Sequence, residues 1–285
     1  MIIVIVGPTG VGKTKLSIEL AKKYNAIIIN NDAMQVYKEM NIGTAKPSIK
    51  EREGIEHKLL DFVDINNNYT VYDYQRDARN IIDNTNDNII FVGGTGLYLK
   101  AALYDYNFTM EEDSEDFDDL SNEELYELAL KKDPNVDIHK NNRQRLIRFL
   151  NKKDINNNNG NNLLYNTIFI GLTTDRDNLY KRINDRVDEM LKEGLLDEVK
   201  NLYDRNINSK AINTAIGYKE LYKYFNNEIS LDEAIDLIKK NSRHYAKRQY
   251  TWFNNQMDIK WFNTNYEDFN KTIDEVDKYI KSQTN

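Results

Sequence analysis

Residues 7–14 form a loop with the composition needed to bind a phosphate group. They read Gly-Pro-Thr-Gly-Val-Gly-Lys-Thr, a complete GxxxxGK[ST] pattern, and they directly follow the apolar run 2–6. Glycines let the backbone turn so that successive amide N–H groups face one anion, and the start of the following helix adds its positive dipole end. We therefore predict a phosphate or pyrophosphate site formed by Gly7, Pro8, Thr9, Gly10, Val11, Gly12, Lys13 and Thr14.

Lys13 and Thr14 have separate predicted tasks in this loop. The Lys13 ammonium is a mobile cation for the outer phosphates, and the Thr14 hydroxyl is a ligand for a magnesium ion. A simple glycine-rich turn between strand and helix is the alternative, but the complete motif in this position favours a phosphate site. The loop alone does not identify the molecule that carries the phosphate.

Two further segments follow apolar runs and are expected at the same edge of a sheet. Asp32 comes after the run 26–29, and Gly93-Gly94-Thr95-Gly96 closes the run 89–92. A carboxylate at that edge is able to accept a proton or to hold magnesium through water, and the glycine turn offers close backbone approach and a hydroxyl. The alternatives are a helix N-cap for the aspartate and a plain tight turn for the glycines.

The elements that would position these residues alternate along the chain. Short apolar runs, typical of strands buried on both faces of a parallel sheet, occur at 2–6, 26–29, 89–92 and 167–172. Helical patterns occur at 13–24, 71–83, 97–103, 175–194 and 230–253, with capping-box pairs at Thr70/Asp73, Ser121/Glu124 and Ser230/Glu233. The alternation predicts an α/β fold with a doubly wound parallel sheet, whose ligand lies at the carboxyl ends of the strands.

The remaining segments suggest four blocks. We predict a phosphate-loop α/β core in two parts, 1–105 and 165–225, a helical insertion at 106–164, and a helical C-terminal region at 226–285. The polar tail after Thr264 is predicted to be a loosely held helix.

The bulk composition excludes several classes of protein. The chain has 285 residues and no cysteine, which excludes disulfides, cysteine-based zinc sites and thiol nucleophiles. No apolar run approaches the roughly 20 residues of a membrane span, and no signal peptide precedes the first strand. We expect a cytoplasmic monomer that does not associate with membranes.

The net charge of −7 is unevenly distributed. Residues 111–119 carry seven acids and no base; without them the 46 acidic residues become 39, equal to the 39 basic residues. Two basic clusters contain no acid: Lys140, Arg143, Arg145, Arg148, Lys152 and Lys153, and Lys239, Lys240, Arg243, Lys247 and Arg248. Such clusters indicate a polyanionic partner, although a solvated helix face is the alternative for either one.

The chain resembles the bacterial tRNA dimethylallyltransferases from the first strand to about Trp261. The segments that carry the resemblance are GPTGVGKT (7–14), NNDAMQVYKEMNIGTAKPS (30–48), VGGTGLYLKAAL (92–103), NRQRLIR (142–148), GLTTDRDNLYKRINDRVDEML (171–191), AIGYKE (215–220) and RHYAKRQYTWF (243–253). The combinations of DAMQVY with GTAKP and of YAKRQ with TWF are specific to this family, whereas the phosphate loop is not.

The resemblance implies a reaction and a set of site residues. A dimethylallyl group would pass from dimethylallyl pyrophosphate to the exocyclic amine of the adenosine 3′ of the tRNA anticodon, with release of pyrophosphate and with Mg²⁺ as cofactor. The implied catalytic residues are Asp32, Thr9 and Lys13, and Thr14 is the metal ligand. The implied contacts to the tRNA anticodon stem-loop are Asp32, Ala33, Met34, Gln35, Thr95, Gln144, Arg145, Leu146, Ile147 and Arg148.

One departure and two alternatives stand beside this interpretation. Thr214 occupies a position where many members of the family have arginine or glutamine, so Arg182 or Arg186 is expected to substitute. A P-loop kinase acting on a nucleoside or another small molecule would share the loop and the magnesium but would consume ATP. An RNA-binding protein whose loop senses a nucleotide would bind tRNA without turnover. The interpretation as a plain ATPase is less well supported, because the run 89–92 ends in glycines and not in the acid that many nucleotide hydrolases use for magnesium.

Overall fold

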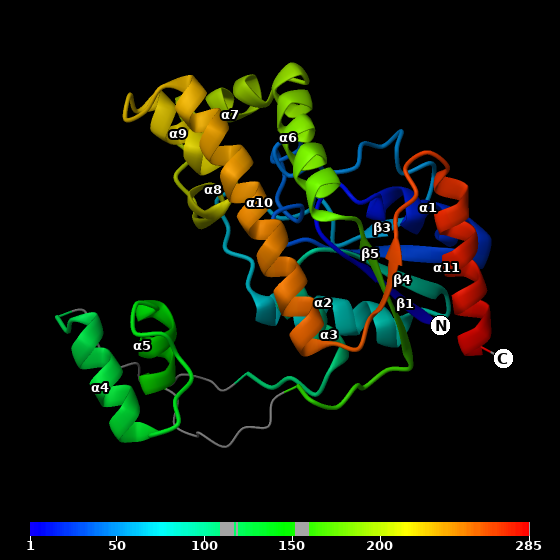
Figure 1. Cartoon of the computed structure of the whole chain (residues 1–285), viewed down its shortest axis with the longest axis horizontal. Helices are drawn as coiled ribbons and strands as arrows, with labels where there is room; N and C mark the ends of the chain where they lie inside the picture. Colours follow the sequence, from blue (N-terminus) through cyan, green and yellow to red (C-terminus); the bar gives the residue numbers. More distant parts are fainter. Residues whose placement is uncertain (109–116, 118, 152–159, 285) are drawn as a thin grey trace. The chain divides into compact units, whose positions relative to one another are not determined.

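The computed structural model describes residues 1–108, 117, 119–151 and 160–284 of the chain. The chain divides into two compact units (Figure 1). One is made of the described residues within 1–104 and 163–284, and the other of those within 105–162.

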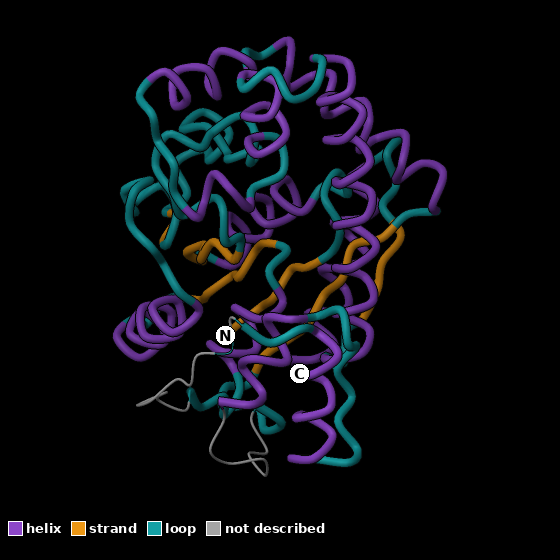
Figure 2. The backbone as a smooth tube through the Cα atoms, turned by 90° about the vertical axis from the view of Figure 1, so that its left-hand side faces the viewer, coloured by secondary structure: helices purple, strands orange, loops and turns teal. Residues whose placement is uncertain are grey.

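A six-stranded parallel sheet lies at the centre of the larger unit (Figures 1 and 2). In spatial order the strands are β3 (His57–Lys58), β2 (Ala26–Asn31), β4 (Asn88–Gly93), β1 (Ile2–Val6), β5 (Thr167–Thr173) and β6 (Lys260–Asn263). The four predicted strands are confirmed as β1, β2, β4 and β5. The two edge strands were not predicted, because they are short and lack an apolar run.

The register of the sheet brings the predicted site segments to one edge. Ile5 of β1 pairs with Val92 of β4, and Gly93 at the end of β4 pairs with Asn31 at the end of β2. The loops that follow these three strands therefore leave the sheet at neighbouring points. This is the edge at which doubly wound folds bind ligands.

Helices cover both faces of the sheet, as the prediction of a doubly wound fold requires. Alternate residues of β1 point to opposite faces. One face packs on α1 (Lys13–Tyr24), α6 (Arg176–Lys192) and α11 (Phe269–Thr284). The other face packs on α2 (Val71–Asn84), α3 (Gly96–Leu103) and the end of α10 (Leu231–Gln256).

A separate helical layer completes the larger unit. The helices α7 (Leu195–Asp204), α8 (Lys210–Thr214) and α9 (Tyr218–Phe225) gather at one end of α10, away from the sheet (Figure 1). Their shared core includes Leu195, Val199 and Tyr218 and extends to Val36 and Met40 in the segment after β2. The helical layer therefore packs directly on the segment that follows Asp32.

The helix α11 is firmly packed, so the prediction of a loosely held tail is wrong. Val276 and Ile280 are fully buried with α1 and the sheet. Asp277 forms ion pairs with Lys23 and Lys281 and accepts a hydrogen bond from Tyr24, and these partners lower its pKa to about 2 despite its burial. The few apolar residues of this helix lie three or four apart on one face, a pattern that is hard to recognise because the segment is mostly polar.

The described part of the smaller unit contains two helices, α4 (Asn122–Lys132) and α5 (Arg143–Asn151), which pack around a small apolar core. The predicted capping box of Ser121 and Glu124 is present at the start of α4. Most of the acidic run (111–116 and 118), together with Lys152 and Lys153 of the first basic cluster, lies outside the described residues.

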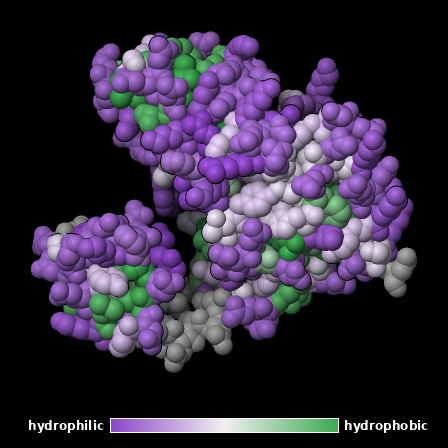
Figure 3. Space-filling view, in the orientation of Figure 1, coloured by the Kyte–Doolittle hydropathy of each residue, from purple (hydrophilic) through white to green (hydrophobic). Residues whose placement is uncertain are grey.

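Among the described residues, no helix is long and apolar enough to span a bilayer. Polar side chains cover most of the face of the larger unit seen in Figure 3, with apolar areas only between them.

Candidate active site

The loop 7–14 leaves β1 and enters α1 with three glycines at positive φ. The φ angles are 140° at Gly7, 85° at Gly10 and 92° at Gly12, a region that side chains disfavour. A Cβ at Gly7 would overlap the carbonyl oxygen of Leu172, and one at Gly12 would lie 2.6 Å from the ring of Phe269. The loop therefore needs glycine both for its backbone angles and for its close neighbours.

The side chain of Lys13 folds back onto its own loop, where its amine is available to bind an anion. Its Nζ donates a hydrogen bond to the carbonyl oxygen of Pro8 at 2.7 Å. Burial, and then the nearby guanidinium of Arg186, lower the pKa of Lys13 to about 7, against an opposing effect of the Asp32 carboxylate. A bound pyrophosphate would provide the negative charge that restores the ammonium form.

Two arginines of α6 extend the cationic lining of the loop. Arg186 Nη1 donates to Thr9 Oγ1 at 2.9 Å, and Arg182 Nε donates to the carbonyl oxygen of Gly10 at 3.0 Å. Both arginines contact the phosphate loop, and the expectation that one of them substitutes for an arginine at position 214 stays a prediction. Thr214 itself lines the cavity, but its hydroxyl donates to Lys210 O at 2.7 Å within α8.

Asp32 is a desolvated carboxylate on the wall of the cavity. Burial raises its pKa, although the Met34 N–H and the Lys13 ammonium act in the opposite direction. Its Oδ1 accepts the Met34 N–H at 2.9 Å, so the turn role considered from the sequence is real for one oxygen. A carboxylate of this kind is suited to accept a proton from a bound group.

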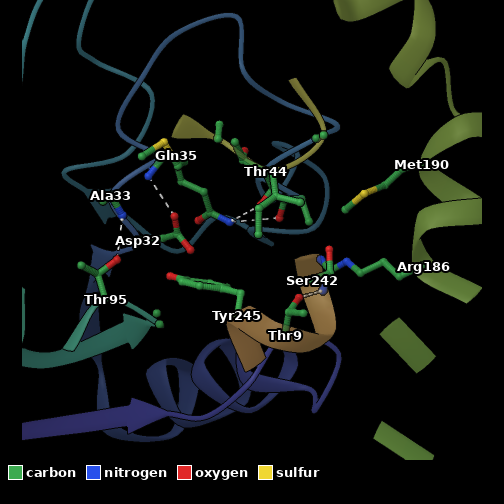
Figure 4. Close-up of a pocket in the computed structure, with 18 of the residues that line it drawn as sticks. Thr9, Asp32, Ala33, Gln35, Thr44, Thr95, Arg186, Met190, Ser242 and Tyr245 are labelled. Atoms are coloured by element: carbon green, nitrogen blue, oxygen red, sulfur yellow. Dashed lines mark hydrogen bonds between the residues drawn. The ribbon is translucent and has the colours of Figure 1, made fainter. Parts of the chain in front are cut away.

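Thr95 ties the Asp32 segment to the glycine turn after β4. Its Oγ1 accepts the N–H of Ala33 at 3.0 Å, and its own N–H donates to Asn31 O at 3.0 Å (Figure 4). Asn31 Nδ2 returns a hydrogen bond to Thr95 O at 3.2 Å. These bonds hold the backbone on either side of Asp32.

Helix α10 packs closely against the backbone of the glycine turn. The glycines of the turn had indicated that some group approaches its backbone closely. A Cβ at Gly94 would overlap the amide of Gln249, and one at Gly96 would overlap the ring of Trp252. Gln249 Nε2 donates to Gly94 O at 3.0 Å, whereas its buried Oε1 has no hydrogen-bond partner among the described residues. The neighbour that requires glycine here is protein, not ligand.

Tyr245 is a site residue that the sequence reasoning missed. It lies one helical turn before Gln249, its side chain is close to those of Thr95 and Gln249, and burial raises its pKa. Figure 4 shows its ring entering the cavity beside Asp32. The available signal was the spacing of four within YAKRQ, which places both side chains on one helix face.

The side chain of Gln35 is held in one orientation by the backbone of Thr44 and Ala45. Its Nε2 donates to the carbonyl oxygens of Thr44 and Ala45 at 2.9 and 3.1 Å. Because both N–H groups are used, its Oε1 offers only a hydrogen-bond acceptor.

A cavity of about 370 Å³ brings these groups together. Its lining includes Thr9, Asp32, Gln35, Thr95, Arg186, Met190, Ser242 and Tyr245 (Figure 4). Lys13 also lines it. A larger cavity of about 1130 Å³ shares Lys13, Thr14 and Arg186 with it. The phosphate loop therefore lies between two solvent-accessible spaces.

Thr14 is the one predicted metal ligand, and its surroundings fit a phosphate-bound ion. Its residue is exposed and lines both cavities. Within the described ranges, no group of three or more His, Cys, Asp or Glu residues is arranged to hold a metal. A Mg²⁺ ion here would take most of its oxygens from the phosphates and from water, as this ion commonly does.

The residues predicted to contact RNA in the insertion differ in accessibility. Gln144, Arg145 and Arg148 are exposed on α5, and Ile147 is partly buried. Leu146 is fully buried with Leu125, Ala129 and Ile138, so its side chain forms part of the core of the smaller unit and is not exposed for RNA in this structure. A helix that packs on a neighbour cannot present every residue of a segment to a ligand.

The second basic cluster divides into two groups. Lys239 forms an ion pair with Asp188 at 2.6 Å, and Arg243 donates to Asn184 Oδ1 at 2.6 Å, so these two join α10 to α6. The remaining members, Lys240, Lys247 and Arg248, are exposed, and Arg248 also lines the smaller cavity.

Comparison with known proteins identifies the family. The family model described as IPP transferase matches residues 35–256. This chain belongs to the IPP transferase family. Among its relatives, the tRNA dimethylallyltransferase of Geobacillus thermodenitrificans is 46% identical and the alignment covers 98% of this chain and 96% of the relative. The Bacillus subtilis tRNA dimethylallyltransferase is 45% identical, with 92% and 90% covered.

Solved structures of the IPP transferase family have the same fold. The tRNA isopentenylpyrophosphate transferase of Bacillus halodurans is 42% identical, with a TM-score of 0.80 and coverage of 99% of this chain and 96% of that one. A eukaryotic dimethylallyltransferase acting on tRNA is 30% identical, with a TM-score of 0.79 and coverage of 99% and 79%. The predicted family and the phosphate-loop fold are confirmed, and these relatives do not support the kinase alternative.

Proposed function

We propose that this chain transfers a dimethylallyl group from dimethylallyl pyrophosphate to the exocyclic amine of the adenosine 3′ of the tRNA anticodon. Its relatives are named for the prenylation of tRNA, and this chain aligns with them over nearly their whole length. The observation that supports this reaction most strongly is one cavity lined both by Thr9, Lys13 and Thr14 of the phosphate loop and by Asp32, whose pKa is raised by burial.

The loop and its cations would stabilise the leaving group. As the allylic carbon–oxygen bond breaks, negative charge develops on the departing pyrophosphate. Lys13 and Arg186 line the cavity, and together with the amide N–H groups of the loop they would surround the developing charge. Preorganised donors of this kind lower the barrier most when water is excluded. A Mg²⁺ ion held by Thr14 and the phosphate oxygens would neutralise part of the same charge.

Asp32 would act on the nucleophile. The amine of adenine is a weak nucleophile because its lone pair is delocalised into the ring. In the proposed step the nitrogen forms a bond to the allylic carbon, the carbon–oxygen bond to pyrophosphate breaks, and the amine proton passes to the Asp32 carboxylate. Its raised pKa makes it a better base than an ordinary aspartate. Correct positioning of the two substrates would contribute several kcal/mol more, since effective molarities reach about 10⁵ M.

The tRNA would present its adenosine as a single unstacked base. Bases in an anticodon loop are read by stacking and edge contacts, and an enzyme reaches the amine by flipping the nucleotide into a pocket. Ala33, Met34, Gln35 and Thr95 line the cavity and would contact this base, and the exposed Arg145 and Arg148 would bind phosphates of the stem-loop. We propose that the chain acts as a monomer in the cytoplasm, where tRNA is available.

An assay of both donors separates this proposal from the kinase alternative. The protein is incubated with unmodified tRNA, Mg²⁺ and labelled dimethylallyl pyrophosphate, and the tRNA is digested to nucleosides. We expect one prenylated adenosine and one pyrophosphate per transfer without any need for ATP. Phosphorylation of a nucleoside at the expense of ATP, with no label in the tRNA, would show that the proposal is wrong.

A further inference from the structure

We infer that the segment between β6 and α11, residues 264–269, positions the phosphate loop for pyrophosphate. This inference rests on the proposed function, because it assigns positioning residues to the same site. The segment lies after residue 256, where the family model ends. Three of its side chains reach the loop or a residue that holds it.

Thr264 makes the first of these contacts. Its Oγ1 donates a hydrogen bond to the carbonyl oxygen of Val11 at 2.9 Å, and the residue is only 8% exposed. Its own N–H donates to Thr173 O at 2.8 Å, which fixes it to the end of β5. The hydroxyl is therefore held in place by the central sheet.

Tyr266 acts through an arginine. The guanidinium carbon of Arg182 lies 3.9 Å from the centroid of the Tyr266 ring, a distance suited to a cation–π contact. The same guanidinium donates from Nε to the carbonyl oxygen of Gly10. The ring thus restricts the orientation of the group that binds this carbonyl.

Phe269 makes the third contact, at the first residue of α11. Its ring lies so close to Gly12 that a Cβ there would be 2.6 Å from a ring carbon. The ammonium of Lys15 lies 4.9 Å from the centroid of the same ring. The ring therefore packs against the point where the loop becomes α1.

These contacts have a direct consequence for anion binding. In a planar trans peptide the C=O and the following N–H point in opposite directions. The carbonyls of Gly10 and Val11 are held by Arg182 and by Thr264, so the N–H groups of Val11 and Gly12 are directed the opposite way. Amides fixed in this manner need no reorganisation when an anion arrives, and this preorganisation increases affinity.

Substitution of Thr264 tests the inference. Thr264→Val keeps the shape and removes the hydroxyl, whereas Thr264→Ser keeps the hydroxyl. Calorimetric titration of the full-length protein with inorganic pyrophosphate and Mg²⁺ should show a Kd about three- to tenfold higher for the valine variant, the range set by one hydrogen bond, and about the wild-type Kd for the serine variant. In the transfer assay the valine variant should raise KM for the prenyl donor while KM for tRNA stays unchanged.

A matched control separates positioning from general destabilisation. Ile280→Val weakens the packing of α11 at a buried residue outside the 264–269 segment, so it should lower Tm without changing the pyrophosphate Kd. If Thr264→Val fails to fold, Tyr266→Leu against Tyr266→Phe makes the same comparison, with weakened binding expected only when the ring is lost.

Two results would overturn the inference. One is pyrophosphate binding by folded Thr264→Val, or by Tyr266→Leu, with the wild-type Kd. The other is an equal loss of affinity in Ile280→Val. Neither depends on prenyl transfer: a wild-type protein that binds pyrophosphate but does not prenylate tRNA would contradict the proposed function and leave the positioning role standing.

Discussion

Asp32 combines two properties that compete with each other. Its buried position raises the pKa of the carboxyl group, which suits a base but makes the ionised form unfavourable in the folded protein. A group whose pKa is raised by folding destabilises the fold when the pH is high enough to ionise it. Function and stability therefore make opposite demands on this residue.

Asp32→Asn should separate these two demands. We expect kcat for prenyl transfer to fall at least about 100-fold, the usual contribution of a general base, while tRNA affinity stays close to the wild-type value. Tm at pH 7 should rise, because the unfavourable charge is gone. Single-turnover kinetics and thermal unfolding measure the two effects, with exposed Asp64→Asn as the control. An unchanged rate would exclude Asp32 as the base.

The pH dependence of the chemical step should report the same carboxylate. The reaction needs Asp32 ionised, so the single-turnover rate should fall as the pH is lowered through its pKa. Because burial raises that pKa, the half-maximal rate should lie above pH 3.8, the ordinary value for aspartate. The measurement requires saturating substrates and a check that the protein stays folded at each pH. A rate that stays constant down to that value would argue against a proton transfer to Asp32.

At the scale of elements, Glu198 in the first turn of α7 orders the segment 41–45, part of which lines the cavity. Its carboxylate accepts the backbone N–H groups of Asn41, Ile42 and Gly43, and also the hydroxyl of Tyr218. The residues that follow supply the two carbonyls that orient Gln35. Glu198, although remote from the reacting groups, therefore controls which side-chain atom Gln35 presents to the adenine.

Glu198→Gln tests this arrangement. The neutral amide offers one acceptor oxygen in place of two, so the segment 41–45 should lose part of its support. We expect KM for tRNA to rise about three- to tenfold, as for the loss of one or two hydrogen bonds, while the pyrophosphate Kd stays unchanged. Glu193→Gln, an exposed position between α6 and α7, is the matched control. Equal effects from both variants would refute a specific role for Glu198.

Elements with a strong local pattern could be predicted from the sequence, and those that depend on neighbours could not. The strands β1, β2, β4 and β5 are apolar runs, and the capping boxes of α2, α4 and α10 are local signals, so all were found. The strand β6 is stabilised by pairing with β5, and α11 by its few apolar contacts with α1 and the sheet. Such stabilisation comes from tertiary packing, which no short window contains.

The same distinction holds in the candidate site. The loop 7–14, Asp32 and Thr95 follow strands directly, so their shared edge could be inferred from topology. Tyr245 and Glu198 belong to helices that are distant in sequence. Only the packing of these helices places Tyr245 beside Asp32 and Glu198 against residues 41–43. Leu146 was predicted as an RNA contact together with its whole segment, and the sequence pattern did not reveal that its side chain belongs to a core.

At the scale of the whole molecule, two adjacent chain segments connect the insertion to the larger unit. Asp105 N donates to Asn162 O at 2.9 Å, and Leu164 N donates to Leu103 O at 2.8 Å. The two ends of the insertion are therefore close enough to be joined by a short linker, and each unit has its own apolar core.

Replacement of residues 106–161 by a short Gly-Ser linker should leave a folded larger unit. We expect cooperative unfolding and a wild-type pyrophosphate Kd, together with weaker tRNA binding and a shallower dependence of that binding on salt, because phosphate contacts are lost. Arg145→Ala with Arg148→Ala in the full-length protein should reduce the salt slope by about 1.4 to 1.8 if each arginine neutralises one phosphate. An unchanged slope in both variants would show that the insertion does not contact RNA.

The central claim is that one cavity holds a prenyl pyrophosphate and an adenosine on opposite sides of the reacting carbon. A crystal structure with an unreactive thio-analogue of dimethylallyl pyrophosphate, Mg²⁺ and an anticodon stem-loop tests it most directly. We predict the diphosphate on the amides of the loop 7–14 with Lys13 and Arg186, and the adenine amine within hydrogen-bond distance of Asp32. A diphosphate bound away from this loop, or an adenine far from Asp32, would contradict the claim.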